Sequence, residues 1–288
     1  VFVVDYSRID VVVHRLTAST ARSRVMRAAD EAEWLRERGE EIGLYTLHGF
    51  IFFGRANTLL GELRDRIGDT TKVPLRHLII DFRHVTGIDV TAALSFAKLL
   101  DLTEREGCEL VVTGLSTTSW ERLERGGLRD RSSTVGGSAV HRFHDLDRGL
   151  EWCEEQLLVS RPTESTAPSG LRTLIPDALE LEALLRRLDR LEIGVGERLL
   201  VEGDRSTELY LIESGSFTVG LERPGSGVLR LQTTHGSQIL GELGFFFGSP
   251  RNATVVCDQP AVVYRLTVER WGEICAEHPE VARTLDAA

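Results

Sequence analysis

The segment from Leu240 to Thr254 carries residues that can hold a sugar hydroxyl and a phosphate together. Gly241 and Glu242 open a short apolar turn, and Arg251 follows nine residues after the glutamate. A carboxylate accepts hydrogen bonds from hydroxyl groups, whereas the planar guanidinium of arginine grips a phosphate through parallel donors. Backbone N–H groups at the start of the turn after Gly241 add anion donors. The segment therefore indicates a binding site for a ligand with both groups.

This run resembles the phosphate-binding cassette of cyclic nucleotide-binding domains, in which Gly-Glu-Leu-Ala and Pro-Arg-x-Ala-Thr/Ser occupy the same places. Turn signals at 194–197 and 202–204 precede strand-like runs at 209–212 and 217–219, which predict a hairpin around Ser214-Gly215. The resemblance covers about residues 172–288 and implies a β-roll with terminal helices. It implies cAMP or cGMP as a ligand, bound by Gly241, Glu242, Leu243, Gly244, Arg251, Asn252, Ala253 and Thr254. In that family Glu242 would accept from the ribose 2′-hydroxyl and Arg251 would pair with the cyclic phosphate.

The chain departs from the family pattern at three places. Gly244 stands where the family usually has Ala, and we expect little effect because the backbone N–H is the ligand contact. Asn252 either crowds the phosphate or helps to hold it through its amide. The tail after the roll is short, with one helix expected at 268–276 and another from Pro279 to the chain end.

Two further expectations concern side chains of this segment. Phe245, Phe246 and Phe247 are expected to pack in the core and against helices rather than to stack on a base. Glu242 and Arg251 are expected to face the pocket rather than the core, so that substituting them leaves the fold intact.

Composition and charge exclude several classes of protein. The 42% of apolar and 27% of charged residues are typical of a globular domain, and no run of 18 apolar residues predicts a membrane span. The net charge of -10 argues against nucleic acid as a partner. The four cysteines are scattered, which indicates a reducing compartment, and the histidines show no ligand spacing beyond His141-x-x-His144. We predict no metal site, no catalytic residues and no enzyme activity.

Residues 41–158 alternate between strand-like and helix-like runs, which predicts an α/β layer fold. The strongest helix, 91–106, has Asp89 as its expected N-cap and Leu94 in its apolar band. The other expected helices span 57–67, 117–125 and 146–158. The expected strands lie at 43–47, 50–53, 78–82, 109–113 and around 141–143.

Two runs in this part carry a second resemblance. Residues 48–57 contain Gly-Phe-Ile-Phe-Phe-Gly-Arg-Ala-Asn, and 88–91 read Ile-Asp-Val-Thr. They resemble the STAS domain of sulfate-permease (SulP) anion transporters, in which a Gly-x-Ile/Leu-Phe-Phe-x-x-Ala-Asn run precedes the first helix and Ile-Asp-x-Thr opens a later one. Residues 5–10 resemble the stretch after the last membrane helix of those transporters. Arg55 and Asn57 would then pack against the transport domain or bind a small ligand.

A related use of the STAS fold is the anti-sigma factor antagonist. In that family the residue directly after the aspartate is a phosphorylatable Ser or Thr. Val90 holds this position here and has no hydroxyl, while Thr91 lies one residue further on and is expected to cap or pack the helix. The sequence therefore disfavours a kinase-switched antagonist.

The two resemblances together predict a cytosolic regulatory region of a SulP-type inorganic anion transporter. We expect a juxtamembrane linker at 1–40, a mixed-sheet STAS domain at 41–158, a linker at 159–171 and a cyclic nucleotide-binding domain at 172–288. Since the chain has no initiator methionine, we expect it to be a piece of a longer protein. The expected partners are the transmembrane domain of the same transporter, at the cytoplasmic face of the membrane, and a second copy. The alternatives are a ligand-free structural module and a soluble STAS-type signalling protein.

The expected linker makes a direct prediction. Residues 159–171 carry two prolines and no apolar periodicity, and such exposed segments are preferred sites of proteolysis. We expect limited proteolysis to cleave first between Val159 and Leu171 and to release two resistant fragments, as identified by mass spectrometry. First cleavage between residues 60 and 110 would contradict this division.

Overall fold

The chain separates into two units. The computed structural model describes residues 11–27, 29–131, 139–161, 171, 174–175, 177–223, 227–236, 238–279 and 282–283. The first unit comprises Val1–Ser23 and Ala29–Arg161, and the second comprises Arg24–Ala28 and Pro162–Ala288. The sequence features at 5–10, most of the expected linker and the end of the expected last helix lie outside the described residues.

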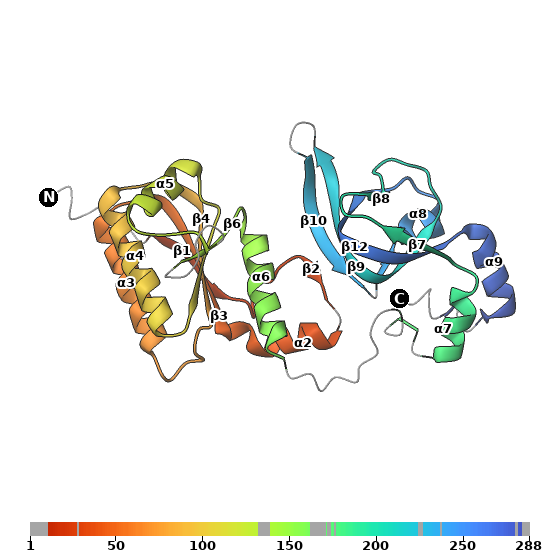
Figure 1. Cartoon of the computed structure of the whole chain (residues 1–288), viewed down its shortest axis with the longest axis horizontal. Helices are drawn as coiled ribbons and strands as arrows, with labels where there is room; N and C mark the ends of the chain where they lie inside the picture. Colours follow the sequence, from red (N-terminus) through yellow and green to blue (C-terminus); the bar gives the residue numbers. More distant parts are fainter. Residues whose placement is uncertain are drawn as a thin grey trace. The chain divides into compact units, whose positions relative to one another are not determined.

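A five-stranded mixed sheet forms the centre of the first unit (Figure 1). β3, β4, β5 and β6 run parallel, and β1 pairs with β3 in the antiparallel direction. In order across the sheet, the strands are β1 (Val12–Thr17), β3 (Ile42–Ile51), β4 (His77–Ile88), β5 (Glu109–Thr113) and β6 (His141–Phe143). The two strands expected at 43–47 and 50–53 are thus one continuous strand, β3.

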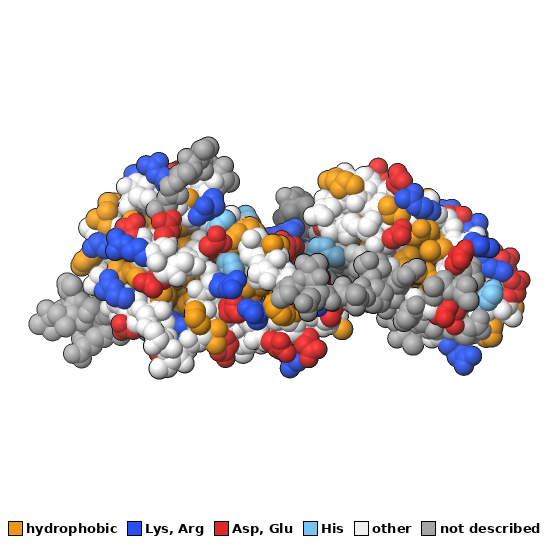
Figure 2. Space-filling view, turned by 60° about the horizontal axis from the view of Figure 1, so that its bottom comes forward, with side chains coloured by type: hydrophobic (Ala, Val, Ile, Leu, Met, Phe, Trp, Pro, Cys, Tyr) orange, Lys and Arg blue, Asp and Glu red, His pale blue; other side chains and the backbone are white. Residues whose placement is uncertain are grey.

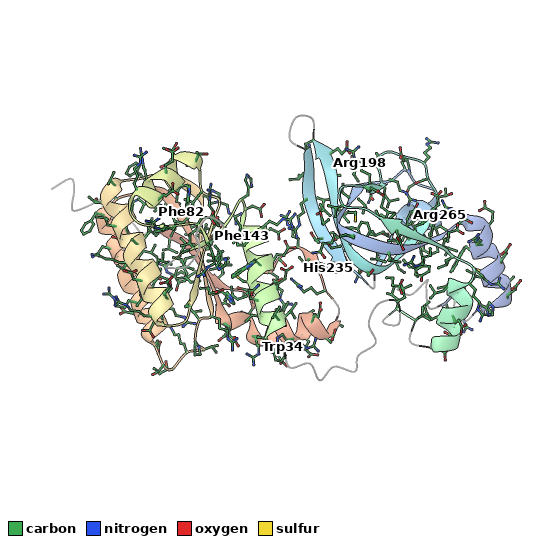
Figure 3. The ribbon with its side chains drawn as sticks, in the orientation of Figure 1. Trp34, Phe82, Phe143, Arg198, His235 and Arg265 are labelled. Atoms are coloured by element: carbon green, nitrogen blue, oxygen red, sulfur yellow. The ribbon has the colours of Figure 1, made fainter. Side chains whose placement is uncertain are left out.

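Helices cover both faces of this sheet because successive strand residues point to opposite sides. On β4, Leu78, Ile80 and Phe82 (labelled in Figure 3) pack toward the face covered by α3, α4 and α5. Ile79 packs toward the face covered by α2 and α6. The helices are α2 (Ala29–Arg38), α3 (Phe53–Gly68), α4 (Val90–Arg105), α5 (Thr117–Arg125) and α6 (Leu146–Val159), with a short 3-10 turn at Gly39–Glu41.

Asp89 fixes the start of α4, as its sequence position predicted. Its carboxylate accepts from the backbone N–H of Ala92 at 2.5 Å and from that of Phe53 at 3.3 Å, so one side chain serves the first turns of α4 and α3. The Thr91 hydroxyl donates to the same carboxylate at 2.8 Å. Leu94, expected in the apolar band of α4, is instead 52% exposed, as are Phe50, Phe53 and Val90 to similar degrees.

The second unit is a β-roll with helices at its ends. Its strands follow the order β2-β10-β9-β12-β7, with β11 also paired to β9 and β8 to β12. The strands are β2 (Val25–Met26), β7 (Asp189–Ile193), β8 (Arg198–Leu200), β9 (Leu209–Arg223), β10 (Gly227–His235), β11 (Gln238–Leu240) and β12 (Thr254–Leu266). The helices are α7 (Ala178–Leu185), α8 (Glu242–Phe247) and α9 (Val268–Glu277), and α9 agrees with the helix expected at 268–276.

Strand β9 joins two small cores. Tyr210 and Ile212 point into the roll, where they pack with residues such as Phe217 and Val263. Leu209 and Leu211 point to the other side, where they pack against α7, α9 and Phe245 of α8. The expected hairpin around Ser214-Gly215 is wrong because the strand continues through it. Gly215 has φ +93°, and a Cβ there would lie 2.4 Å from the Cβ of Ala261, which explains the glycine.

The surface has mixed charges, and three of the four cysteines are buried. Charged side chains of both signs are interspersed on the face of each unit drawn in Figure 2. Cys108, Cys153 and Cys257 are buried, and burial raises the pKa of the Cys108 thiol to about 12. Among the described residues, no helix combines the length and the apolar character needed to cross a membrane.

The capping role of Asp89 can be tested by measuring the free energy of unfolding. Asp89→Ala removes the acceptor for two backbone N–H groups and should lower the free energy of unfolding by about 1–2 kcal/mol in urea denaturation. Asp101→Ala removes the same charge from an exposed position within α4 and should change stability by at most about 0.5 kcal/mol. Equal effects of the two substitutions would contradict the capping role.

Candidate functional site

A cavity of about 890 Å³ opens in the second unit beside α8. All its lining residues belong to this unit, and they include seven of the eight residues that the sequence assigned to a ligand. These seven are Gly241, Glu242, Leu243, Gly244, Arg251, Asn252 and Ala253. Helix α8 begins at Glu242 because Gly241, in the left-handed conformation with φ +87°, turns the chain from β11 into the helix.

The guanidinium of Arg251 is held by three acceptors from neighbouring segments. Nε donates to Ser206 Oγ at 2.9 Å, Nη1 to the Gly241 carbonyl at 2.7 Å and Nη2 to the Glu208 carbonyl at 2.5 Å. Its backbone also pairs with the 203–204 turn, since Arg251 N donates to the Asp204 carbonyl and Gly203 N donates to the Arg251 carbonyl, both at 2.8 Å. Arg251 therefore joins the loop before β9, the start of α8 and the start of β12.

Arg251 is both buried and charged. Its side chain lines the cavity, but only 4% of the residue is exposed. Burial lowers the pKa of its guanidinium, while Tyr210, Glu208 and Glu242 raise it through their charges. The expectation that Arg251 faces the pocket rather than the core is therefore only half right. The side chain lines the cavity, but it is also buried and hydrogen-bonded within the protein.

Two glycines make room for this guanidinium. A Cβ on Gly241 would lie 2.5 Å from Arg251 Nη1, and a Cβ on Gly244 would lie 2.7 Å from the same atom. Contacts this short force a shift. Gly244 was expected to matter little in place of the family's alanine. That expectation concerned the backbone N–H and stays a prediction; the structure adds that Gly244 lies against the guanidinium of Arg251.

The other assigned residues divide between the cavity and the protein interior. Glu242 and Asn252 are exposed and line the cavity, and the buried Ala253 lines it as well. Thr254 lies outside the lining. Its hydroxyl accepts from the backbone N–H of Glu202 at 3.0 Å and lies 3.4 Å from a carboxylate oxygen of Glu222. The alternation of side chains along β12 explains this, since Ala253 and Val255 line the cavity while Thr254 points to the other side.

The three phenylalanines of α8 do not share one role. Phe245 is buried and packs edge-on against Trp271 of α9, as expected for a core residue. Phe246 also packs edge-on against Trp271 of α9, as expected, but it is 39% exposed and lines the cavity. The expectation is wrong for Phe247, which is 78% exposed and lines the cavity as well. Together with Leu243, which is 40% exposed, they give the cavity an apolar rim.

Sequence reasoning missed several residues of the site, among them Ser206, Glu208 and Met26. Ser206 and Glu208 hold Arg251, and the proximity of 202–208 to the cassette can be recognised only once β9 and β12 are paired. Met26 also lines the cavity although it stands more than 200 residues before Gly241, and no local pattern signals this placement.

Two of the candidate residues of the first unit, Arg55 and His141, contact other side chains or the backbone of that unit. Arg55 is buried, donates to the Phe50 carbonyl at 3.2 Å and lies 4.8 Å from the ring of Phe52, whereas Asn57 is exposed. His141 stacks on Trp152 at 3.9 Å between ring centroids, and burial lowers its pKa. His144 has a fully exposed side chain. The sequence pair His141-x-x-His144 thus does not converge on one point.

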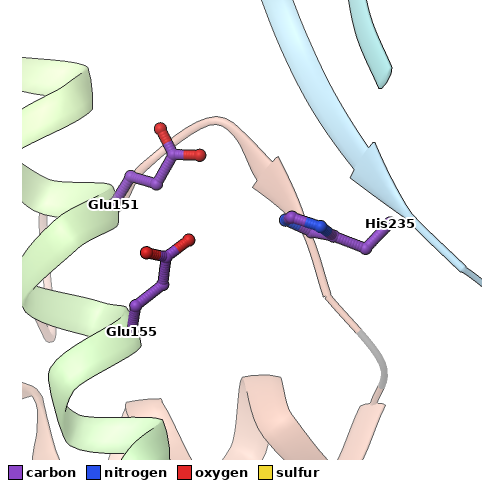
Figure 4. Close-up of side chains that lie close together, drawn as sticks. All are labelled: Glu151, Glu155 and His235. Carbon is purple, nitrogen blue, oxygen red and sulfur yellow. The ribbon is translucent and has the colours of Figure 1, made fainter. Parts of the chain in front are cut away.

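Figure 4 draws three side chains of metal-ligating type. Glu151 and Glu155 lie one turn apart on α6 and point to the same side of that helix. His235 stands at the end of β10. The glutamates belong to the first unit and the histidine to the second, so no common site is assigned to them.

The comparisons with known proteins identify both units. Residues 34–138 match the STAS domain, and residues 190–278 match the cyclic nucleotide-binding domain. A 164-residue stretch, 54% of this chain, is 27% identical to the vacuolar basic amino acid transporter VSB1 of Saccharomyces cerevisiae. Another 84 residues, 29% of the chain, are 33% identical to the cAMP-dependent protein kinase regulatory subunit of Yarrowia lipolytica. These matches span only 15% and 21% of the two relatives.

Solved structures also match part of this chain. A cyclic nucleotide-binding domain from Methylobacillus flagellatus is 24% identical and covers 38% of this chain and 61% of its own, with a TM-score of 0.35. The Thermus thermophilus catabolite activator protein is 22% identical and covers 38% of this chain and 52% of its own, with a TM-score of 0.36.

The packing of Gly241 against Arg251 can be tested by substitution. Gly241→Ala combines a positive φ with a displaced guanidinium and should lower the free energy of unfolding by about 2–4 kcal/mol. Gly196→Ala is the matched control, because Gly196 has φ +82° but a Cβ there meets nothing within 4 Å. Its cost should be limited to the strained backbone, about 1–2 kcal/mol. Chemical denaturation measures both, and a cost for Gly241→Ala no larger than the control would contradict the role of this contact.

Proposed function

Given a STAS domain followed by a cyclic nucleotide-binding domain, we propose that this chain is the regulatory region of a SulP-type inorganic anion transporter and that its second domain senses cAMP or cGMP. The STAS domain would dock to the transmembrane domain of the same transporter, at the cytoplasmic face of the membrane, and would dimerise. The match to a transporter supports the transporter part of this proposal, and the matches to cAMP-dependent regulatory subunits support the nucleotide part.

The arrangement of Arg251 carries the nucleotide proposal. Its three hydrogen bonds use one N–H on each nitrogen of the guanidinium. A guanidinium has five N–H donors, so one donor remains on Nη1 and one on Nη2. We assign these two donors to oxygens of the phosphate, for which the Glu208 carboxylate, 3.9 Å from Nη2, is a competing acceptor. The three acceptors hold the fork at the cavity before a ligand arrives, which reduces the ordering cost of binding.

Glu242 and the main chain complete the site. Glu242 stands at the first position of α8, lines the cavity and is exposed, so its carboxylate can accept from a ribose hydroxyl. The backbone N–H groups of Leu243 and Gly244 belong to the first turn of α8, where N–H groups have no partner within a helix. They supply the main-chain donors to the cyclic phosphate, while the apolar rim of Leu243, Phe246 and Phe247 suits a purine base.

One observation favours a second candidate function. Because Arg251 already has three partners in the protein, it stabilises the roll without any ligand. This supports the ligand-free alternative, in which the second domain only contacts other proteins. A soluble, kinase-switched STAS protein has less support, since Val90 has no hydroxyl and the Thr91 hydroxyl is bonded to Asp89.

The first domain offers a surface for docking. Phe50, Phe53, Val90 and Leu94 are 43%, 52%, 62% and 52% exposed, and they lie where β3 ends and where α3 and α4 begin. Exposed apolar side chains gathered at one place commonly mark a protein contact. This surface supports the proposed docking of the STAS domain.

Substitutions at the cavity test nucleotide binding. Arg251→Ala should lower affinity for the cyclic nucleotide by roughly ten- to a hundredfold, because it removes a charge-assisted pair of contacts. Arg251→Lys should lose much of the affinity as well, since an ammonium cannot reproduce the fork. Glu242→Gln should weaken binding less, because the amide oxygen still accepts. Displacement of a fluorescent cyclic nucleotide measures all three.

A stability measurement separates the two roles of Arg251. Contrary to the sequence expectation, Arg251→Ala should also cost about 1–3 kcal/mol of stability, because it leaves the partly buried Gly241 and Glu208 carbonyls without their donor. Glu242→Gln should leave stability unchanged. Arg205→Ala, at an exposed arginine of the same loop, is the matched control and should alter neither quantity. Unchanged affinity in folded Arg251→Lys and Glu242→Gln would contradict the proposed site.

A further inference from the structure

Five residues from the N-terminal part of the chain belong to the second unit. Arg24–Ala28 stands in sequence between β1 and α2, both of which are part of the first unit. Within it, the two residues of β2 pair in parallel with β10, Val25 opposite Thr233 and Met26 opposite Thr234 (Figure 1). Thr233 N donates to the Arg24 carbonyl at 3.0 Å. β2 is therefore an edge strand that the N-terminal part of the chain contributes to the roll.

Met26 places this strand at the ligand cavity. Its side chain lines the cavity and is 43% exposed, as is Leu231 of the adjacent β10 at 42%. A methionine thioether is flexible and polarisable, and its contacts with aromatic rings are favourable. A purine in the cavity would find Met26 among the apolar side chains that it can touch.

The chain on both sides of β2 is anchored in the first unit. Directly before it, Ser23 N donates to a carboxylate oxygen of Glu154 on α6 at 2.9 Å, and the Ser23 hydroxyl lies 2.5 Å from the other oxygen. Directly after it, α2 begins at Ala29, and Leu35 of this helix packs in the core of the first unit. Any movement of β2 must therefore be taken up by a chain that is fixed at both ends.

We propose that Met26 is a ligand-contacting residue and that β2 couples occupancy of the cavity to the first unit. This rests on the proposed function, because it requires a nucleotide in the cavity. A ligand that touches Met26 binds more tightly when β2 is paired with β10 than when it is not. By linkage, the ligand then favours the paired state of β2 to the same extent. The STAS domain senses the nucleotide through the residues that flank this strand.

The sequence offers a single-site probe of this contact. Met26 is the only methionine, so a chain labelled with ¹³C-methyl methionine gives one resonance once any initiator methionine has been removed. Met26→Ala assigns the signal by its loss. On titration of the full chain with cAMP and cGMP, we expect the methyl resonance to move upfield because the purine ring lies against it. We also expect slower hydrogen exchange over 23–29.

Affinity measurements give the matched comparison. Met26→Ala should weaken nucleotide binding by about three- to tenfold, since part of an apolar contact is lost. Leu229→Ala is the control, because Leu229 is 50% exposed on the same neighbouring strand but does not line the cavity. It should leave affinity unchanged.

The outcomes separate this proposal from the one on which it rests. If the unmodified chain binds no cyclic nucleotide, both proposals are wrong. If it binds but the Met26 methyl does not move, or if Met26→Ala binds as tightly as Leu229→Ala, only the role of β2 is overturned. A moved methyl without slower exchange at 23–29 would overturn the coupling to the first unit.

Discussion

The second domain depends on one buried cation. The guanidinium of Arg251 takes the carbonyl oxygens of Gly241 and Glu208 and the hydroxyl of Ser206, and it thereby fastens three segments that are distant in sequence. Burying a charged arginine is costly unless it is hydrogen-bonded and paired. Here two backbone carbonyls and a hydroxyl accept from it, and the Glu208 carboxylate lies 3.9 Å from Nη2. Gly241 fits this arrangement, because its φ is +87° and a Cβ there would lie 2.5 Å from Arg251 Nη1 and 3.0 Å from the Glu208 carbonyl oxygen.

The same arrangement lets one residue hold the fold and also line the cavity of the proposed site. Three of the five N–H donors hold the protein together, and the proposed site assigns the other two to a ligand in the cavity that Arg251 lines. The position of the fork is then set by the backbone of its neighbours rather than by the ligand. In the first domain, Asp89 acts in a comparable way, because one carboxylate fixes the starts of both α3 and α4.

The elements that depend on local pattern could be predicted from the sequence. α4, α5, α6 and α9 begin and end close to the expected residues, and seven of the eight assigned residues line one cavity. What the sequence could not show depends on pairing between distant segments. Gly215 was predicted to lie in a turn, because the sequence does not show that Ala261 of the neighbouring strand leaves no room for a Cβ there. Thr254 looked like a ligand residue because the side to which β12 turns it was not yet defined, and Met26 carried no signal at all.

The expectations that Leu94 and Phe247 are buried were wrong for a related physical reason. Helical periodicity places a residue on a face, but only the packed neighbours decide whether that face is covered. Both side chains are more than half exposed, one at the start of α4 and the other at the rim of the cavity. Both residues were expected in a core but are exposed. Leu94 lies on the surface proposed for docking, and Phe247 lies at the rim of the proposed ligand cavity.

The central claim is that the second domain binds a cyclic nucleotide in the Arg251 cavity. Isothermal titration calorimetry of the full chain with cAMP and with cGMP tests it most directly. The account predicts saturable heat with one site per chain for at least one of the two nucleotides. No heat with either nucleotide at millimolar concentration, from protein shown to be folded by circular dichroism, would contradict it and leave the domain as a ligand-free contact module.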